Sequence, residues 1–138
     1  MELKLNSGRL SVPIIRDGKK AGVLCFNPSD INFVDNFRAT AERYDQYINE
    51  LRTRSAALKE GDDDGYLALI REICERMCTA IDELFGPGTS DAAFGCTPCS
   101  PEPFEDFFGG VAELIREYRM ERMKRYLPTG AETEDGLV

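Results

Sequence analysis

The sequence predicts a mainly α-helical protein of the α+β class, in which a short N-terminal β-hairpin precedes three helices, the first of them long. Three observations lead to this prediction. Apolar residues alternate on both sides of an Asp-Gly turn, three later segments repeat apolar residues at steps of three and four, and Gly-, Pro- or Asp-rich stretches separate the segments. Residues 1–127 are expected to form one domain, since 138 residues with 42% hydrophobic content suit a single core.

The hairpin is predicted within residues 1–27. Apolar residues alternate over residues 10–14, and a second apolar run covers residues 23–26. Asp17-Gly18 between them favours a tight turn, because both residues tolerate a positive φ angle. Residues 3–5 are expected to add one more short strand. A sheet this thin must pack on another element to be stable.

Helices are predicted over residues 30–58, 65–85 and 103–127. The first would be about 42 Å long over residues 31–58, at about 1.5 Å per residue. Its apolar positions form a heptad seam of about four repeats, which must pack against a neighbouring helix or a second subunit. The seam consists of Val34, Phe37, Ala41, Tyr44, Ile48, Leu51, Ser55 and Leu58.

Capping residues mark the ends of these helices. Ser29 or Asp30 is expected to cap the first helix, and Asp62-Asp63-Asp64 to cap and begin the second, where negative charge is favourable. A calcium loop is the alternative for these acids, but Arg71 stands where such a loop needs a distal Glu. Gly86-Pro87 is expected to end the second helix in a left-handed cap. Residues 86–103 are then expected to be a loop, and residues 128–138 a disordered acidic tail.

Composition argues against several classes of function. The chain has no histidine, which removes the commonest general base and nitrogen metal ligand, so we expect a protein that is not an enzyme. A net charge of -8 disfavours nucleic-acid binding. No apolar run reaches the roughly 20 residues of a membrane span, and no secretory signal precedes the hairpin. The expected location is the cytoplasm, with no membrane partner.

Four cysteines are the strongest candidates for metal chemistry. Cys96 and Cys99 form a CxxC in the predicted loop, and Cys74 and Cys78 lie one helical turn apart. Together they could form a zinc site of four thiolates. The alternative is that the helix pair are small core residues and the loop thiols are incidental. We favour this alternative, because structural zinc sites normally use two tight knuckles, and we expect no metal or other cofactor.

Three sequence segments carry a resemblance to a known family. They are the hairpin Ile14-Ile15-Arg16-Asp17-Gly18 with residues 21–26 running into Asn27-Pro28-Ser29-Asp30, the helix end and loop over residues 84–95, and Phe104-Glu105-Asp106-Phe107-Phe108 with residues 121–126. In their order and spacing, these segments resemble the tail assembly chaperones of long-tailed bacteriophages and prophages. The Cys96–Cys99 segment departs from that family's pattern.

The resemblance implies a protein without enzymatic activity in the cytoplasm of a bacterial host. Such proteins bind the tape measure protein, a very long amphipathic helical chain, and keep it soluble during tail assembly; the tail tube protein is a further candidate partner. Apolar helix faces suit a helical client, and an acidic exterior suits solubility.

Seven residues are predicted to form either the core or the client-binding surface: Phe37, Tyr44, Ile48, Leu51, Phe104, Phe107 and Phe108. Two rival hypotheses remain open at this point. One is a zinc-stabilised regulatory or scaffold module that uses Cys74, Cys78, Cys96 and Cys99. The other is a homo-oligomer that buries the long seam between subunits.

Overall fold

The computed structural model describes residues 1–126, and its order of elements confirms the predicted fold class. Strands β1 (Leu10–Arg16) and β2 (Lys19–Phe26) form an antiparallel hairpin. Four helices follow: α1 (Ile31–Ala56), α2 (Asp63–Phe85), α3 (Thr89–Phe94) and α4 (Glu102–Tyr126). The predicted acidic tail over residues 128–138 lies outside the described residues.

The chain divides into two compact units, Met1–Phe108 and a second unit that starts at Gly109. The first unit holds the hairpin, α1, α2, α3 and the first turns of α4. The second holds the rest of α4, where Arg116 pairs with Glu113 at 2.7 Å. The helix α4 runs through Gly109-Gly110 without interruption.

The hairpin forms where the sequence predicts it. Asp17 (φ 54°) and Gly18 (φ 77°) both adopt positive φ angles, as the Asp-Gly pair allows. The register shifts between Ile14 and Ile15, which leaves Ala21 as the extra residue of a β-bulge. The further strand predicted at Leu3 and Leu5 is wrong: residues 1–9 pair with no strand among the described residues, because the sheet contains β1 and β2 only.

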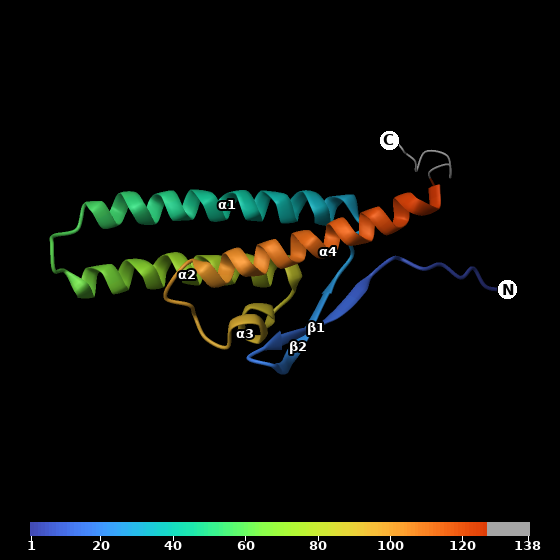
Figure 1. Ribbon diagram of the computed structural model, residues 1–138, viewed down its shortest axis with the longest axis horizontal. Helices are drawn as coiled ribbons and strands as arrows, with labels where there is room; N and C mark the ends of the chain where they lie inside the picture. The colour runs from blue at the N-terminus through green and yellow to red at the C-terminus, as the bar shows by residue number, and fades with distance from the viewer. Residues whose placement is uncertain (127–138) are drawn as a thin grey trace. The chain divides into compact units, whose positions relative to one another are not determined.

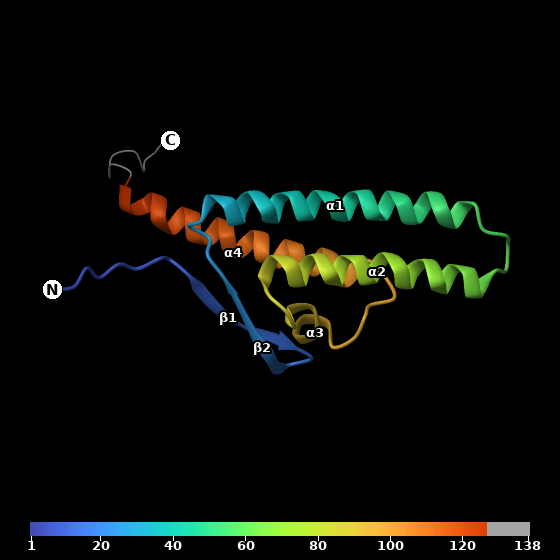
Figure 2. The same ribbon diagram turned by 180° about the vertical axis from the view of Figure 1, so that it is seen from behind.

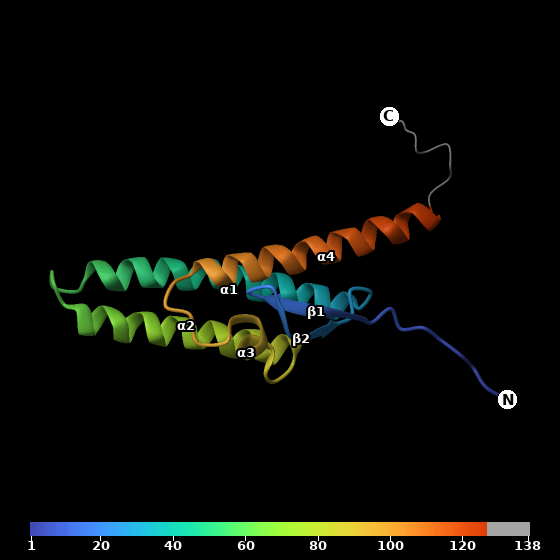
Figure 3. The same cartoon turned by 60° about the horizontal axis from the view of Figure 1, so that its bottom comes forward.

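A short helix, α3, lies in the segment that was predicted to be a loop. Gly88 precedes it in a left-handed conformation (φ 86°), and the Asp82 carboxylate accepts hydrogen bonds from the Ser90 amide at 2.8 Å and its hydroxyl at 3.0 Å. Six residues are too few for a periodic pattern, so the Gly-, Ser- and Thr-rich composition hid this helix. Figure 3 shows α3 beside the hairpin.

The hairpin packs closely on α3. A Cβ atom added at Gly22 would lie 2.8 Å from Cβ of Ala92, so only glycine allows this approach without a shift. The Arg16 guanidinium donates hydrogen bonds to the carbonyl oxygens of Ala92 and Asp91, near the negative end of the α3 dipole. The thin sheet is therefore held against a helix, as its size requires.

Helices α1 and α2 lie side by side and antiparallel, joined by a short loop at one end (Figures 1 and 2). Asp30 caps α1 by accepting from the Asn32 amide at 2.9 Å, and Asp62 caps α2 by accepting from the Gly65 amide at 2.9 Å. The capping role predicted for these acids is thus confirmed. At the end of α2, Gly86 has a positive φ angle of 118° with an extended ψ of 154°, and not the left-handed conformation that was expected.

The core of the first unit contains one continuous cluster of aromatic rings. Every phenylalanine of the chain belongs to it, together with Tyr44, through ring centroids 5.0–6.5 Å apart. These rings come from β2, α1, α2, α3 and the first turns of α4, so the cluster joins all of these elements. Its members are Phe26, Phe33, Phe37, Tyr44, Phe85, Phe94, Phe104, Phe107 and Phe108.

Candidate functional site

The seven predicted core or client-binding residues divide by burial. Phe104, Phe37, Phe108, Tyr44 and Leu51 are buried, and Phe107 and Ile48 are half-buried. Five of the seven belong to the aromatic cluster, while Ile48 and Leu51 lie farther along α1. Most of the set therefore lies in the interior of the fold.

Tyr44 shows how tightly this interior is arranged. Its hydroxyl donates to Oε1 of Glu105 at 2.8 Å and lies 3.3 Å from the carbonyl oxygen of Pro101. The pKa of Tyr44 is raised above its ordinary value, mainly by burial and to a smaller extent by the hydrogen bond to Glu105. The hydroxyl thus stays protonated at neutral pH and ties α1 to the beginning of α4, which is a structural and not a chemical role.

The four cysteines do not assemble a metal site. In the part of the chain that the structure describes, no group of three or more Cys, Asp or Glu side chains is arranged to hold a metal ion. Cys74 is buried, and this burial, with Cys78 and Cys99 nearby, raises the pKa of the Cys74 thiol to about 11. A thiol in such a setting stays protonated and unreactive. The geometry gives the zinc alternative no support.

An open groove runs along the antiparallel pair α1 and α2. Its middle encloses about 470 Å³, and two adjoining hollows enclose about 180 Å³ and 160 Å³. The three hollows share lining residues, so they form one feature, which we call the α1–α2 groove. It is lined by Asn36, Ala39, Thr40, Arg43, Tyr47, Arg54 and Leu58 on one side and by Gly65, Ala68, Leu69, Arg71, Glu72, Glu75, Arg76, Thr79, Ala80, Glu83 and Leu84 on the other.

Small residues make this groove. Ala39, Ala68 and Thr79 are exposed, and Ala80 is buried at its base. Short side chains at these positions leave room for a helix to approach closely, since interaxial distances of about 8–10 Å depend on the size of the residues at the contact. Sequence periodicity missed this surface, because alanines and charged residues between apolar positions look like an ordinary solvated helix face.

A network of four charged residues crosses from α1 to α2 at the groove. Arg54 pairs with Glu72 at 2.6 Å and with Glu50 at 2.8 Å, while Arg76 pairs with Glu50 at 3.0 Å and also with Glu72. The Arg76 guanidinium also lies 5.5 Å from the centre of the Tyr47 ring. These contacts hold the two helices in one register.

The network should make stability depend on acid pH. The hydrogen bond from Arg54 lowers the pKa of Glu72 to about 2, and that from Arg76 lowers the pKa of Glu50. A carboxylate with a depressed pKa stabilises the fold above its unfolded value of about 4.3, and this contribution is lost as pH falls toward the folded value. We expect Glu72→Gln to flatten the loss of thermal stability between about pH 4.5 and 2.

Thermal melts followed by circular dichroism across this pH range test the expectation. Glu75→Gln is the matched control, because Glu75 lies on the same helix and forms no ion pair among the described residues. An unchanged acid slope in Glu72→Gln would show that the network does not couple folding to protonation. Because all four side chains are partly exposed, high salt should also weaken the effect.

The chain can be placed in a protein family from its sequence. No helix within residues 1–126 has the length and apolar character needed to cross a membrane. Comparison with curated proteins and with solved structures gives no match. A family model described as a family of unknown function, DUF6673, matches residues 23–134, from β2 through both helices of the groove and α4. This chain belongs to the DUF6673 family.

Proposed function

We propose that this protein is a non-enzymatic tail assembly chaperone of a bacteriophage or prophage, which binds the tape measure protein in the host cytoplasm and keeps it soluble. The α1–α2 groove is the observation that carries the proposal. It offers two antiparallel helices with a small-residue base, onto which a helix of the client can pack as a further member of the bundle. The resemblance of three sequence segments to such chaperones supplies the identity of the client.

The electrostatics support the same function. The chain carries a net charge of -8, which favours solubility of a complex with a long amphipathic partner. The charges that line and border the groove are balanced: Arg43, Arg54, Arg71 and Arg76 against Glu50, Glu72, Glu75 and Glu83. A client helix therefore meets a neutral groove and not a repulsive acidic face. The tail tube protein is a second candidate partner in the same assembly.

Co-expression with the tape measure protein of the same genome tests this function. The client should stay soluble and co-purify only when this protein is present. Ala68→Trp should lower client binding at least about tenfold, because a large side chain at this exposed position would fill the groove, and such an affinity loss corresponds to about 1.4 kcal/mol.

Ala56→Trp is the matched control. Ala56 is also an exposed alanine of the α1–α2 pair, but it does not line the groove. The Ala56→Trp variant should bind the client as tightly as the unmodified protein. If the solubility of the client does not depend on this protein, the proposed function is contradicted. If Ala68→Trp and Ala56→Trp lower client binding equally, the client binds elsewhere on the surface.

A further inference from the structure

Arg43 and Glu83 are two of the charged residues of the α1–α2 groove that form no ion pair within residues 1–126; Arg71 and Glu75 are the others. Arg43 and Glu83 line the same two adjoining hollows at one end of the groove, and both are exposed. Among residues 1–126, neither forms an ion pair; the Arg43 guanidinium only donates to the Thr40 hydroxyl at 3.2 Å. The other end of the groove differs, because Glu50, Arg54, Glu72 and Arg76 satisfy one another there.

Two-fold symmetry would bring these charges together. A two-fold axis parallel to the helices places α1 of one copy over α2 of a second copy. Such a rotation leaves the height of every residue along the helix axis, here called its level, unchanged. Because Arg43 and Glu83 lie at one level, Arg43 of each copy then faces Glu83 of the other. The contact is self-complementary and closes on two copies, as an isologous interface requires. An axis perpendicular to the helices would instead place α1 over α1 and separate these opposite charges.

The balance of charge favours a second copy as the occupant. Two chains of net charge -8 repel each other at long range. At the groove, four arginines offset three lining glutamates and the neighbouring Glu50, so two copies can meet there without that repulsion. Small residues at its base also allow the four helices to approach as an antiparallel bundle.

We infer that the protein forms a homodimer in which a second copy covers the α1–α2 groove, with Arg43 of each copy paired to Glu83 of the other. The dimer would be the resting state of the chaperone, and a client helix would displace the second copy. This displacement rests on the proposed function, whereas the dimer itself does not. The groove would thus be protected whenever no client is present.

Charge reversal tests the dimer through mixing. Arg43→Glu and Glu83→Arg should each weaken dimerisation at least about tenfold, because each puts two like-charged pairs across the interface. In an equimolar mixture of the two variants, every Arg43–Glu83 contact again joins opposite charges, so a heterodimer should form. Light scattering after size exclusion and native mass spectrometry measure both results. Rescue by mixing cannot arise from a change inside one chain.

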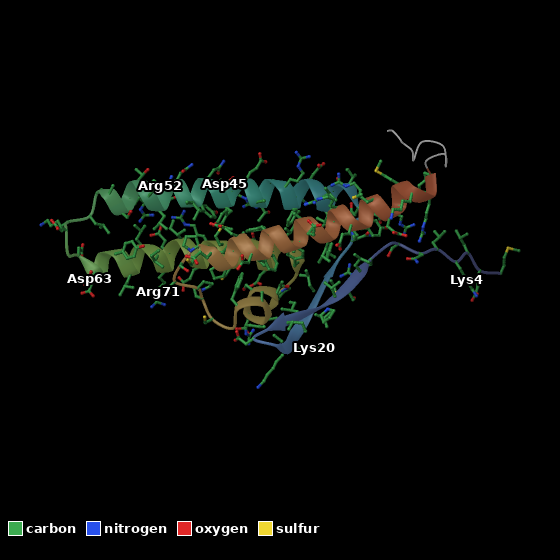
Figure 4. All side chains as sticks on the ribbon, in the orientation of Figure 1. Lys4, Lys20, Asp45, Arg52, Asp63 and Arg71 are labelled. Carbon is green, nitrogen blue, oxygen red and sulfur yellow. The ribbon has the colours of Figure 1, made fainter. Side chains whose placement is uncertain are left out.

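Arg52→Glu is the matched control, since it makes the same charge change on α1 away from the groove. Figure 4 shows Arg52 and Asp45 projecting from α1 on the side away from α2. This variant should remain dimeric. If a reversal variant loses its helical circular dichroism signal, Arg43→Gln and Glu83→Gln replace the pair and should each weaken the dimer without repulsion.

Several results would overturn the inference. A monomeric unmodified protein at submillimolar concentration excludes the dimer, and a dimer that survives both reversals excludes this interface. Variants that stay monomeric when mixed exclude the Arg43–Glu83 register. The client experiment gives a separate answer: client bound to an intact dimer contradicts displacement, while a dimer that binds no client contradicts only the proposed function.

Discussion

Phe104→Ala should lower the free energy of unfolding by about 3–5 kcal/mol, the usual cost of removing a buried phenylalanine ring. Phe104 is 1% exposed, and its ring centroid lies 5.0 Å from that of Phe94. The contact joins the beginning of α4 to α3, so truncation leaves a cavity where these two elements meet. Because domains are stable by only about 5–15 kcal/mol, this loss would leave much of the protein unfolded or easily unfolded.

Urea denaturation followed by circular dichroism measures this change. Tyr66→Ala is the control, because Tyr66 is 45% exposed on α2 and its removal should change stability little. A loss below about 1 kcal/mol in Phe104→Ala would mean that the ring is not closely packed. Phe104 would then again be a candidate for contact with a client.

Leu51→Glu should be the second strongly disruptive change. Leu51 is 9% exposed on the face of α1 that packs inward, and an uncompensated buried charge costs about 3–5 kcal/mol. The same change at a client-binding surface would weaken binding and leave the fold intact. Loss of the fold would instead place Leu51 in the core, as its burial indicates.

The pH dependence of Leu51→Glu identifies the cause. Burial would raise the pKa of the new carboxyl group, since it favours the neutral form. The variant should therefore regain stability as pH falls from 7 toward 5, where the glutamate becomes protonated in the folded state. Leu51→Gln is the matched control, because it is polar and similar in size but cannot ionise. If both variants show the same pH profile, the charge is not the reason for the loss.

Local signals in the sequence were sufficient for most of the elements. The Asp17-Gly18 turn and the Asp30 and Asp62 caps all appear where they were predicted. Each depends on residues within about one or two turns of chain, and so each can be recognised without knowledge of the fold.

The candidate site could not be predicted in the same way. The sequence showed that Phe37 and Phe104 are apolar and lie on helix faces, but burial depends on which other elements cover those faces. The ring contacts that decide this join residues up to 71 positions apart, as between Phe37 and Phe108. The groove residues Arg43 and Glu83 likewise come from two helices, and their shared level follows from the pairing of α1 with α2.

The sequence by itself determined the order of hairpin and helices, the acidic character of the chain and the positions of the caps, because these follow from local conformation and composition. Only the tertiary structure decided that all the phenylalanines join one aromatic cluster, that the hairpin packs on α3, and that α1 and α2 leave an open groove. The physical reason is that packing is non-local. An apolar side chain contributes the same hydrophobic free energy in a core or in an interface, and only its neighbours in space distinguish the two.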